Sequence, residues 1–315
     1  MIKRRTSITL IILILLTAFI VYATLFKTVH RKEIIINASV PVIHREISSL
    51  NKIARWFLPF ASADTSSNKI IKQERLEHEN SSLKISSIIG YSVQYEVAEN
   101  KNSKPILFSV MPDTGHYTKV TVSYTSTLWQ EIFNSGKINQ HTEKSLESLK
   151  DYIGDAKKMY GYEVEMTNVT DTAFLFSSKV VSKQEKKAAI TNLYASLIKF
   201  AEIKNLGYND VRIFYMLPYG KDSIHLFTSI GITNTDNVPF TGPFILKRMP
   251  YMGRLLMSYY QGSFGNAIAP LNALAQYETD NDMNSMAIPF IKLITEGIEF
   301  DDSQIIQARA LYPVY

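Results

Sequence analysis

The sequence predicts an α+β protein that has an N-terminal transmembrane helix followed by two domains with antiparallel sheets. Three observations predict this architecture. An apolar run without a charge spans Ile8 to Phe26. Runs that alternate apolar and polar residues follow between residues 83 and 129, ahead of a helical pattern at 141–158. In the C-terminal half, the order strand, helix, strand, strand occurs twice.

The apolar run over 8–26 predicts a membrane anchor, which with its basic flanks occupies residues 1–31. About 19 uncharged residues are long enough to cross a bilayer core. A cleavable signal peptide is the alternative, because Val21, Tyr22 and Ala23 loosely satisfy the small-residue cleavage rule. Three basic residues precede the run and three follow it, which nearly balances the positive-inside rule. Since a short basic tail usually stays in the cytoplasm, we expect a single-pass protein of the cell membrane with extracytoplasmic domains.

The positive charge of the chain belongs to this N-terminal region. Residues 1–33 hold six Lys or Arg and one Glu, a surplus of five that equals the net charge of +5 of the whole chain. The remainder is therefore balanced, and it shows neither a basic stripe with interleaved aromatic residues nor a helix-turn-helix pattern. We expect no nucleic-acid partner. The absence of cysteine excludes disulfides and thiolate chemistry, but it does not identify the compartment.

The first domain is predicted over residues 32–161. It opens with a short strand at Ile34–Ile36, and Ser39 as a cap with Pro41 in the first turn predicts a helix that continues towards Trp56. Strand-like runs follow at 83–99, 104–113 and 116–129. A final helix at 141–158 carries one apolar face, made by Leu146, Leu149, Tyr152 and Ile153.

Four short segments carry a family resemblance in this region: Ile34–Ser39, Trp56–Phe60, Thr118–Tyr124 and Leu146–Tyr152. In these segments and in their order, the domain resembles the SRPBCC superfamily, the helix-grip fold of START and polyketide-cyclase-like proteins. The resemblance implies a sheet folded around the final helix, with an apolar cavity between them. The usual hairpin is reduced to a charged segment at Lys69–Asn80, so the cavity is expected to be small, filled or open.

The second domain is predicted over residues 162–315 as two copies of one unit, at about 162–236 and 247–315. In the first copy a strand at 171–181 precedes a helix at 186–207 and strands at 210–217 and 222–232. In the second, a strand at 255–260, a turn at Gln261–Gly265 and a helix at 267–277 precede strands at 287–294 and 303–314. Strand and helix also alternate by chance in many chains. The matching lengths and turn positions favour a duplication.

The residues of the second copy carry another resemblance, through Tyr259–Gly262 with Phe264, the helix with Leu274 and Tyr277, Pro289, and the closing Leu311–Val314. In this order they resemble the GyrI-like (SOUL-like) domain, the effector-binding module of AraC-type and MerR-type regulators. The resemblance implies a pseudo-twofold pairing of the two units, with a small cationic or aromatic molecule in the cleft between them. A few relatives are hydrolases that use a carboxylate there.

Four residues are candidates for ligand binding in that cleft: Tyr215, Tyr259, Glu296 and Arg309. Many relatives have an acidic residue in the last strand of each unit, whereas this chain has Thr228 and Ser229 in one copy and Arg309 in the other. An arginine that faces the cleft favours an anionic ligand, because its planar fork donates two hydrogen bonds. The alternative is that Arg309 points to solvent or pairs with Glu299.

Other chemistry finds little support. The six histidines are scattered without metal-ligand spacing, and neither phosphate-binding glycine motif occurs, so we expect no metal and no cofactor. Ser263 lies between two glycines in a turn, and the Asp and His that should follow a nucleophile elbow are missing. No catalytic residue is assigned.

The sequence thus predicts a membrane-anchored protein that binds or senses a small apolar or aromatic molecule and lacks a DNA-binding part. One alternative is a hydrolase or cyclase-like enzyme that uses the GyrI-like cleft, which requires an ionisable pair there. The other is an envelope protein whose domains bind other proteins.

Overall fold

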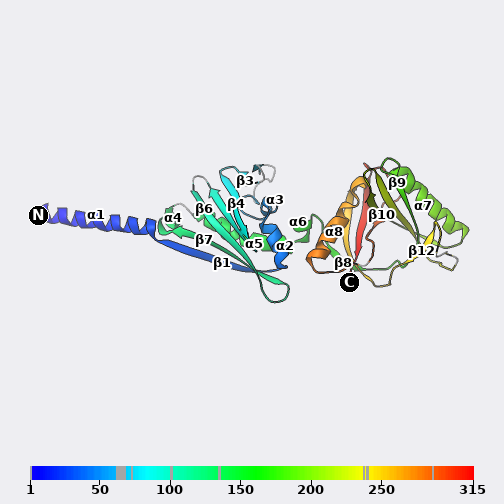
Figure 1. The fold of residues 1–315 in the computed structure, drawn as a ribbon, viewed down its shortest axis with the longest axis horizontal. Helices are drawn as coiled ribbons and strands as arrows, with labels where there is room; N and C mark the ends of the chain where they lie inside the picture. Colours follow the sequence, from blue (N-terminus) through cyan, green and yellow to red (C-terminus); the bar gives the residue numbers. More distant parts are fainter. Residues whose placement is uncertain are drawn as a thin grey trace. The chain divides into compact units, whose positions relative to one another are not determined.

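A computed structural model describes residues 2–61, 69–71, 74–99, 102–133, 136–236, 238, 241–285 and 287–315. The chain divides into two compact units, Met1–Asp155 and Ala156–Tyr315 (Figure 1). Each unit contains one sheet, and every strand pair in both sheets is antiparallel. The predicted α+β class with antiparallel sheets is confirmed.

The predicted transmembrane helix is wrong. The chain begins with helix α1 (Ile2–Leu25), but within the described residues no helix combines the length and the apolar character that crossing a bilayer requires. The expected single-pass localisation and the extracytoplasmic placement that depended on it are corrected accordingly, while the membrane contact over 8–26 stays an expectation.

The first unit is built on a seven-stranded sheet. Its elements are β1 (Lys27–Asn37), α2 (Val40–Ile47), α3 (Leu50–Ile53), β2 (Lys69–Ile71), β3 (Arg75–His78), β4 (Ser81–Ile89), β5 (Ser92–Glu99), β6 (Asn102–Pro112), β7 (Tyr117–Thr127), α4 (Leu128–Phe133) and α5 (Gly136–Gly154). The strand order is β1-β7-β6-β5-β4-β3-β2. Helix α5 lies against β1, β5 and β7 and buries Leu146, Leu149 and Tyr152, the apolar face that its periodicity predicts.

Two features of this unit differ from the sequence prediction. The run at 83–99 forms two strands, β4 and β5, because Gly90 adopts a positive φ of 56° and reverses the chain. The long helix expected before Trp56 is divided into α2 and α3, and Trp56 itself lies in a turn after α3.

The second unit is built on an eight-stranded sheet. Its elements are α6 (Ala156–Tyr160), β8 (Glu165–Asn168), β9 (Ala173–Ser182), α7 (Lys186–Ile203), β10 (Tyr208–Tyr219), β11 (Ser223–Ile232), β12 (Ile245–Arg248), β13 (Arg254–Ser263), the 3₁₀ turn η2 (Phe264–Asn266), α8 (Ala269–Asp280), β14 (Phe290–Leu293) and β15 (Ile305–Pro313). The strand order is β12-β9-β11-β10-β14-β15-β13-β8.

The strand order is symmetric about its centre. Counted from either end of the sheet, equivalent strands of the two copies follow one another in the same order. Strands β9, β10 and β11 of the first copy correspond to β13, β14 and β15 of the second, and β10 pairs with β14 at the centre. Each copy also has a leading strand, and the one of the second copy, β12, is absent from the sequence prediction. The leading strand β8 of the first copy pairs with β13 of the second, while β12 pairs with β9 of the first. The two copies therefore exchange their first strands.

The connections that follow the exchanged strands meet at the centre of the unit. The N–H of Val169, after β8, donates to the carbonyl of Gly253, after β12, over 2.8 Å, and the N–H of Met249 donates to the carbonyl of Thr172 over 2.9 Å. Backbone hydrogen bonds thus tie the two connections to each other. The symmetric arrangement of strands and connections is consistent with a local dyad through the β10–β14 pair.

Helices α7 and α8 cover the same face of the sheet. Tyr194 and Leu197 of α7 belong to one buried core with Leu271 and Leu274 of α8. Figure 1 shows the strands arching between α8 and α7, with β8 and β12 at opposite ends of the arch. A smaller apolar cluster, which includes Phe174, Ile213, Leu255 and Phe290, lies on the inner face of the arch.

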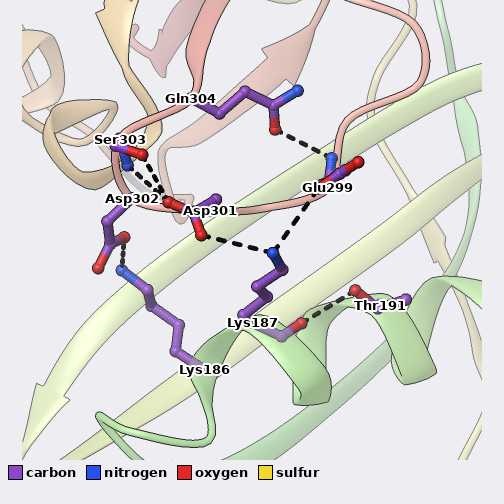
Figure 2. A network of polar contacts seen from close by, with 8 residues as sticks. All are labelled: Lys186, Lys187, Thr191, Glu299, Asp301, Asp302, Ser303 and Gln304. Carbon is purple, nitrogen blue, oxygen red and sulfur yellow. Dashed lines mark hydrogen bonds and ion pairs between the residues drawn. The ribbon is translucent and has the colours of Figure 1, made fainter.

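A polar network on the helix side joins the two copies (Figure 2). Lys187, in the first turn of α7, contacts Asp301 at 3.4 Å and Glu299 at 3.8 Å in the loop before β15, and Lys186 contacts Asp302. The hydroxyl of Ser303 donates to Asp301 over 2.7 Å. These pairs are largely exposed, so they orient the loop more than they stabilise the fold.

Candidate ligand-binding cleft in the second unit

The inner face of the arch forms a cleft of about 460 Å³ over the first copy. Along β9, β10 and β11, alternate side chains point away from α7, which leaves them to line this cleft. We call it the aromatic compartment. Its lining residues are Phe174, Phe176, Ile213, Phe214, Tyr215, Phe227, Ser229, Lys247, Arg248, Met249, Ala287, Ile288, Pro289 and Phe290.

A row of aromatic rings crosses three neighbouring strands in this compartment. The ring of Phe227 on β11 lies 6.2 Å from that of Phe176 on β9 and 6.2 Å from that of Tyr215 on β10, tilted by 35° and 33°. A tyrosine hydroxyl is protonated at neutral pH, and burial raises the pKa of Tyr215 further. The row therefore presents an uncharged surface on which a flat apolar molecule can pack.

The charged groups that line the aromatic compartment are basic. The ammonium of Lys247 lies 5.4 Å from the centre of the Phe176 ring, and Nη2 of Arg248 donates to Oγ1 of Thr235 over 2.9 Å. Among the described lining residues there is no Asp or Glu. This composition favours a neutral or anionic molecule over a cation.

A second hollow of about 110 Å³ adjoins the first, and we call it the polar compartment. The two share four lining residues, Phe174, Ile213, Met249 and Phe290. The residues that line the polar compartment alone are Thr167, Asn168, Val169, Thr170, Asp171, Val211, Leu255, Met257, Lys292, Arg309 and Leu311. Two neighbouring hollows, one aromatic and one polar, thus share part of their lining.

Three charged side chains line the polar compartment. Nζ of Lys292 donates to Oδ2 of Asp171 over 2.6 Å, an ion pair that is about one-quarter exposed. The guanidinium of Arg309 lies 5.3 Å from the centre of the Tyr259 ring. Its Nε atom is buried and has no hydrogen-bond partner among the described residues. The compartment therefore holds a cation with unused donor capacity.

The two compartments occupy equivalent places in the two copies. Phe227 pairs with Tyr215 on the neighbouring strand β10, and Arg309 pairs in the same way with Lys292 on β14. Two residues earlier, Ile213 on β10 corresponds to Phe290 on β14, and both compartments share these residues. The aromatic pair of one copy is thus replaced by a basic pair in the other.

The four candidate residues lie in different surroundings. Tyr215 lines the aromatic compartment and Arg309 lines the polar one. Tyr259 is 54% exposed and contacts Arg309 through its ring. Glu296 is exposed in the loop after β14 and lines neither compartment. The expected alternative of an Arg309–Glu299 pair does not form, because Glu299 contacts Lys187.

Sequence reasoning did not select Phe176, Phe227 or Lys247. Phe174 and Phe176 lie two positions apart in a strand, and residues at this spacing face the same side of the sheet. This spacing could have indicated their role. The contribution of Lys247 depends on the exchanged strand β12, which the sequence analysis did not include.

The turn between β13 and α8 does not open onto the cleft. The N–H groups of Phe264 and Gly265 donate to the carbonyls of Gln304 and Asp302, over 2.8 and 3.0 Å. The strand also continues through Gln261 to Ser263, where the sequence predicts a turn. Carbonyl groups of the loop before β15 thus accept from the N–H groups that follow β13. Ser263 lies at the end of this strand, without the geometry of a nucleophile elbow.

In the first unit, aromatic side chains fill the space between sheet and helices. Trp56, Phe57, Tyr95 and Phe108 are at most 1% exposed, and their rings contact one another. The pocket between the turn at 57–59, β5 and α5 has a volume of about 10 Å³, room for about one water molecule. The small or filled form of the expected cavity is the one observed there.

The described residues contain no group of three or more His, Asp or Glu side chains that could hold a metal ion.

Comparisons with known proteins give structural similarity alone. No family model matches the chain, and no curated protein matches it. A crystal structure of the EcmrR C-terminal domain is similar, with 12% identity over 49% of this chain and 98% of that chain and a TM-score of 0.39. A START superfamily protein from Mycobacterium smegmatis matches with 14% identity over 40% of this chain and 98% of its own, at a TM-score of 0.29. A transcription regulation protein from Staphylococcus aureus MU50 matches with 10% identity over 49% and 99%, at 0.30. We draw no functional argument from similarities of this size.

Proposed function

We propose that the second unit binds a small aromatic or apolar molecule in the aromatic compartment. The observation that carries this proposal is the formed cleft of about 460 Å³, in which Phe176, Phe227 and Tyr215 present a row of rings. Small-molecule sites in proteins have this size range and this mostly apolar lining with a few polar groups.

The arrangement of the unit supports the same proposal. The cleft lies on the face of the sheet opposite α7 and α8, whose side chains form the main core on the other face. The core can therefore stay packed whether or not a molecule occupies the cleft. We infer that the unit is an effector-binding module of the GyrI-like type, and that the first unit, with α5 against its sheet, is a filled helix-grip domain.

Binding suits this cleft better than acid-base catalysis does. A general acid or base needs an ionisable side chain that is free to exchange a proton with the substrate. The carboxylate that lines the described cleft is Asp171, which is held 2.6 Å from Lys292 in the polar compartment. The aromatic compartment offers rings, a serine and basic groups instead.

A fluorescence titration tests the proposal. N-phenyl-1-naphthylamine, a neutral dye that brightens in apolar sites, is added to the full chain and to Phe227→Ala and Tyr215→Ala variants. We expect each variant to bind at least about tenfold more weakly, since each removes a ring from the binding surface. Tyr219→Ala is the matched control, because Tyr219 lies on the same strand, is 59% exposed and does not line the cleft. Equal affinity in all four proteins would contradict the proposal.

A further inference from the structure

The difference between the two compartments points to the kind of molecule that fits the whole cleft. At equivalent places in the two copies, Tyr215 and Phe227 face the aromatic compartment, and Lys292 and Arg309 face the polar one. If both copies served the same contact, the same chemistry would be expected in both. One half of the cleft is instead suited to an apolar body and the other to a charged group.

The charge of the polar part is positive. Lys292 is neutralised by Asp171 at 2.6 Å, which leaves the guanidinium of Arg309 as the uncompensated charge among the described lining residues. Stacking on Tyr259 holds that guanidinium over a ring rather than against a carboxylate. Its buried Nε is a donor without an acceptor among the described residues. A guanidinium that has no carboxylate partner is stabilised by an anionic oxygen that enters the compartment.

The two parts lie next to each other. Phe174, Ile213, Met249 and Phe290 line both compartments, so the two hollows share one wall. Lys247 and Arg248 add two basic groups at the aromatic end. The polar compartment, at about 110 Å³, has room for a carboxylate-sized or sulfonate-sized group.

We propose that the cleft selects aromatic molecules that carry an anionic oxygen group, with the ring in the aromatic compartment and the anion at Arg309 in the polar compartment. This inference rests on the proposed function and adds the charge and the orientation of the ligand. Arg309 is the group that recognises the anion. The neutral ion pair of Lys292 with Asp171 fixes the wall of the compartment.

A pair of dyes with the same aromatic body tests the inference on the full chain. 8-Anilinonaphthalene-1-sulfonate carries one sulfonate, and N-phenyl-1-naphthylamine is its neutral counterpart. We expect the anionic dye to bind wild type about tenfold or more tightly than the neutral one. Arg309→Gln should weaken binding of the anionic dye about tenfold or more and that of the neutral dye far less, while Arg309→Lys retains part of the preference because the charge remains but the planar fork is lost.

The control variant is Arg254→Gln, which removes the same charge from the opposite face of the sheet. Arg254 is exposed and alternates with Leu255, which lines the cleft. An equal loss of anionic-dye affinity in Arg254→Gln and Arg309→Gln would mean that net charge alone acts, and would overturn the inference. If both dyes bind wild type equally and Phe227→Ala weakens both, the inference fails and the proposed function stands. If neither dye binds wild type, both fail.

Discussion

At the scale of single residues, Tyr194 shows how the burial of an ionisable side chain makes the stability of the fold depend on pH. This tyrosine of α7 is 3% exposed, its hydroxyl donates to the carbonyl of Ile213 over 2.8 Å, and its ring stacks on Phe300. Burial raises its pKa above the ordinary value of about 10, chiefly by desolvation. The hydroxyl therefore stays protonated in the folded chain at pH values at which an unfolded chain loses the proton.

This shift predicts an alkaline loss of stability. Below about pH 10 the folded and unfolded chains both keep the proton, so the contribution of Tyr194 is fully present. Above that value only the unfolded chain releases it, and the free energy of unfolding falls by about 1.4 kcal/mol per pH unit for this group. Urea unfolding between pH 9 and about 11 measures the slope. Tyr194→Phe should reduce the slope by one proton, and an unchanged slope would contradict the prediction.

At Gly262 the side chain of Tyr260 lies so close to the backbone that it leaves no room for a Cβ atom. A Cβ at this position would lie 2.6 Å from the hydroxyl oxygen of Tyr260, which donates to the carbonyl of Ser263 over 2.7 Å. We expect Gly262→Ala to displace the tyrosine and to lower the free energy of unfolding by about 1–3 kcal/mol, as overpacking does.

Two comparisons check this prediction in chemical denaturation. Gly154→Ala is the control, because a Cβ there meets nothing within 4 Å, and we expect it to be neutral or slightly stabilising. The cost of Gly262→Ala should shrink when it is combined with Tyr260→Ala, since the hydroxyl oxygen and the ring carbon Cζ, 2.6 and 2.9 Å from the added Cβ, are then both absent. An equal cost in both backgrounds would assign the effect to the backbone instead.

At the scale of secondary-structure elements, periodicity was the reliable guide. The apolar face of α5 and the two strand-helix-strand-strand copies followed from spacing alone, because a buried face repeats every two residues in a strand and every three or four in a helix. Strand β12 was missed because it has four residues and is followed by Pro250, so its local pattern reads as a loop. Its partner β9 lies more than 60 residues earlier, and no local signal reports such a pairing.

The sequence indicated where the cleft lies, but it indicated only some of the residues that line it. The duplication indicated a site between the copies, and Tyr215 and Arg309 indeed line its two compartments. Phe176 and Phe227 come together only when β9 and β11 pair in one particular register. Glu296 was selected from its distance to β14 along the chain, yet the strand ends at Leu293 and leaves that residue in an exposed loop.

At the scale of the whole molecule, the exchanged strands predict that the second unit unfolds as one body. Leu197 of α7 and Leu274 of α8 are both fully buried, one in each copy. Replacing either by alanine should lower the free energy of unfolding by about 2–5 kcal/mol. Because each copy supplies an edge strand to the other, we expect both variants to lower the same transition in scanning calorimetry without splitting it.

The first unit provides a built-in control for this experiment. Both tryptophans, Trp56 and Trp129, belong to it, so tryptophan emission follows its unfolding alone. Leu146→Ala, which removes a fully buried side chain of α5, should shift the transition seen by emission. The variants in α7 and α8 should leave that transition in place. Separate transitions for the two copies would show that the exchanged strands do not couple them.

The exchange of β8 and β12 has a consequence for the ancestry of the cleft. A half-length ancestor with this topology would have had to assemble with an identical chain, because its leading strand found its place only on a partner. Every change in such an ancestor appears on both sides of the symmetry axis at once. Joining the halves into one polypeptide removes that constraint. Aromatic side chains can then occupy positions 215 and 227 while basic side chains occupy the equivalent positions 292 and 309. An asymmetric binding site is thus what a linked pair can evolve and a symmetric homodimer cannot.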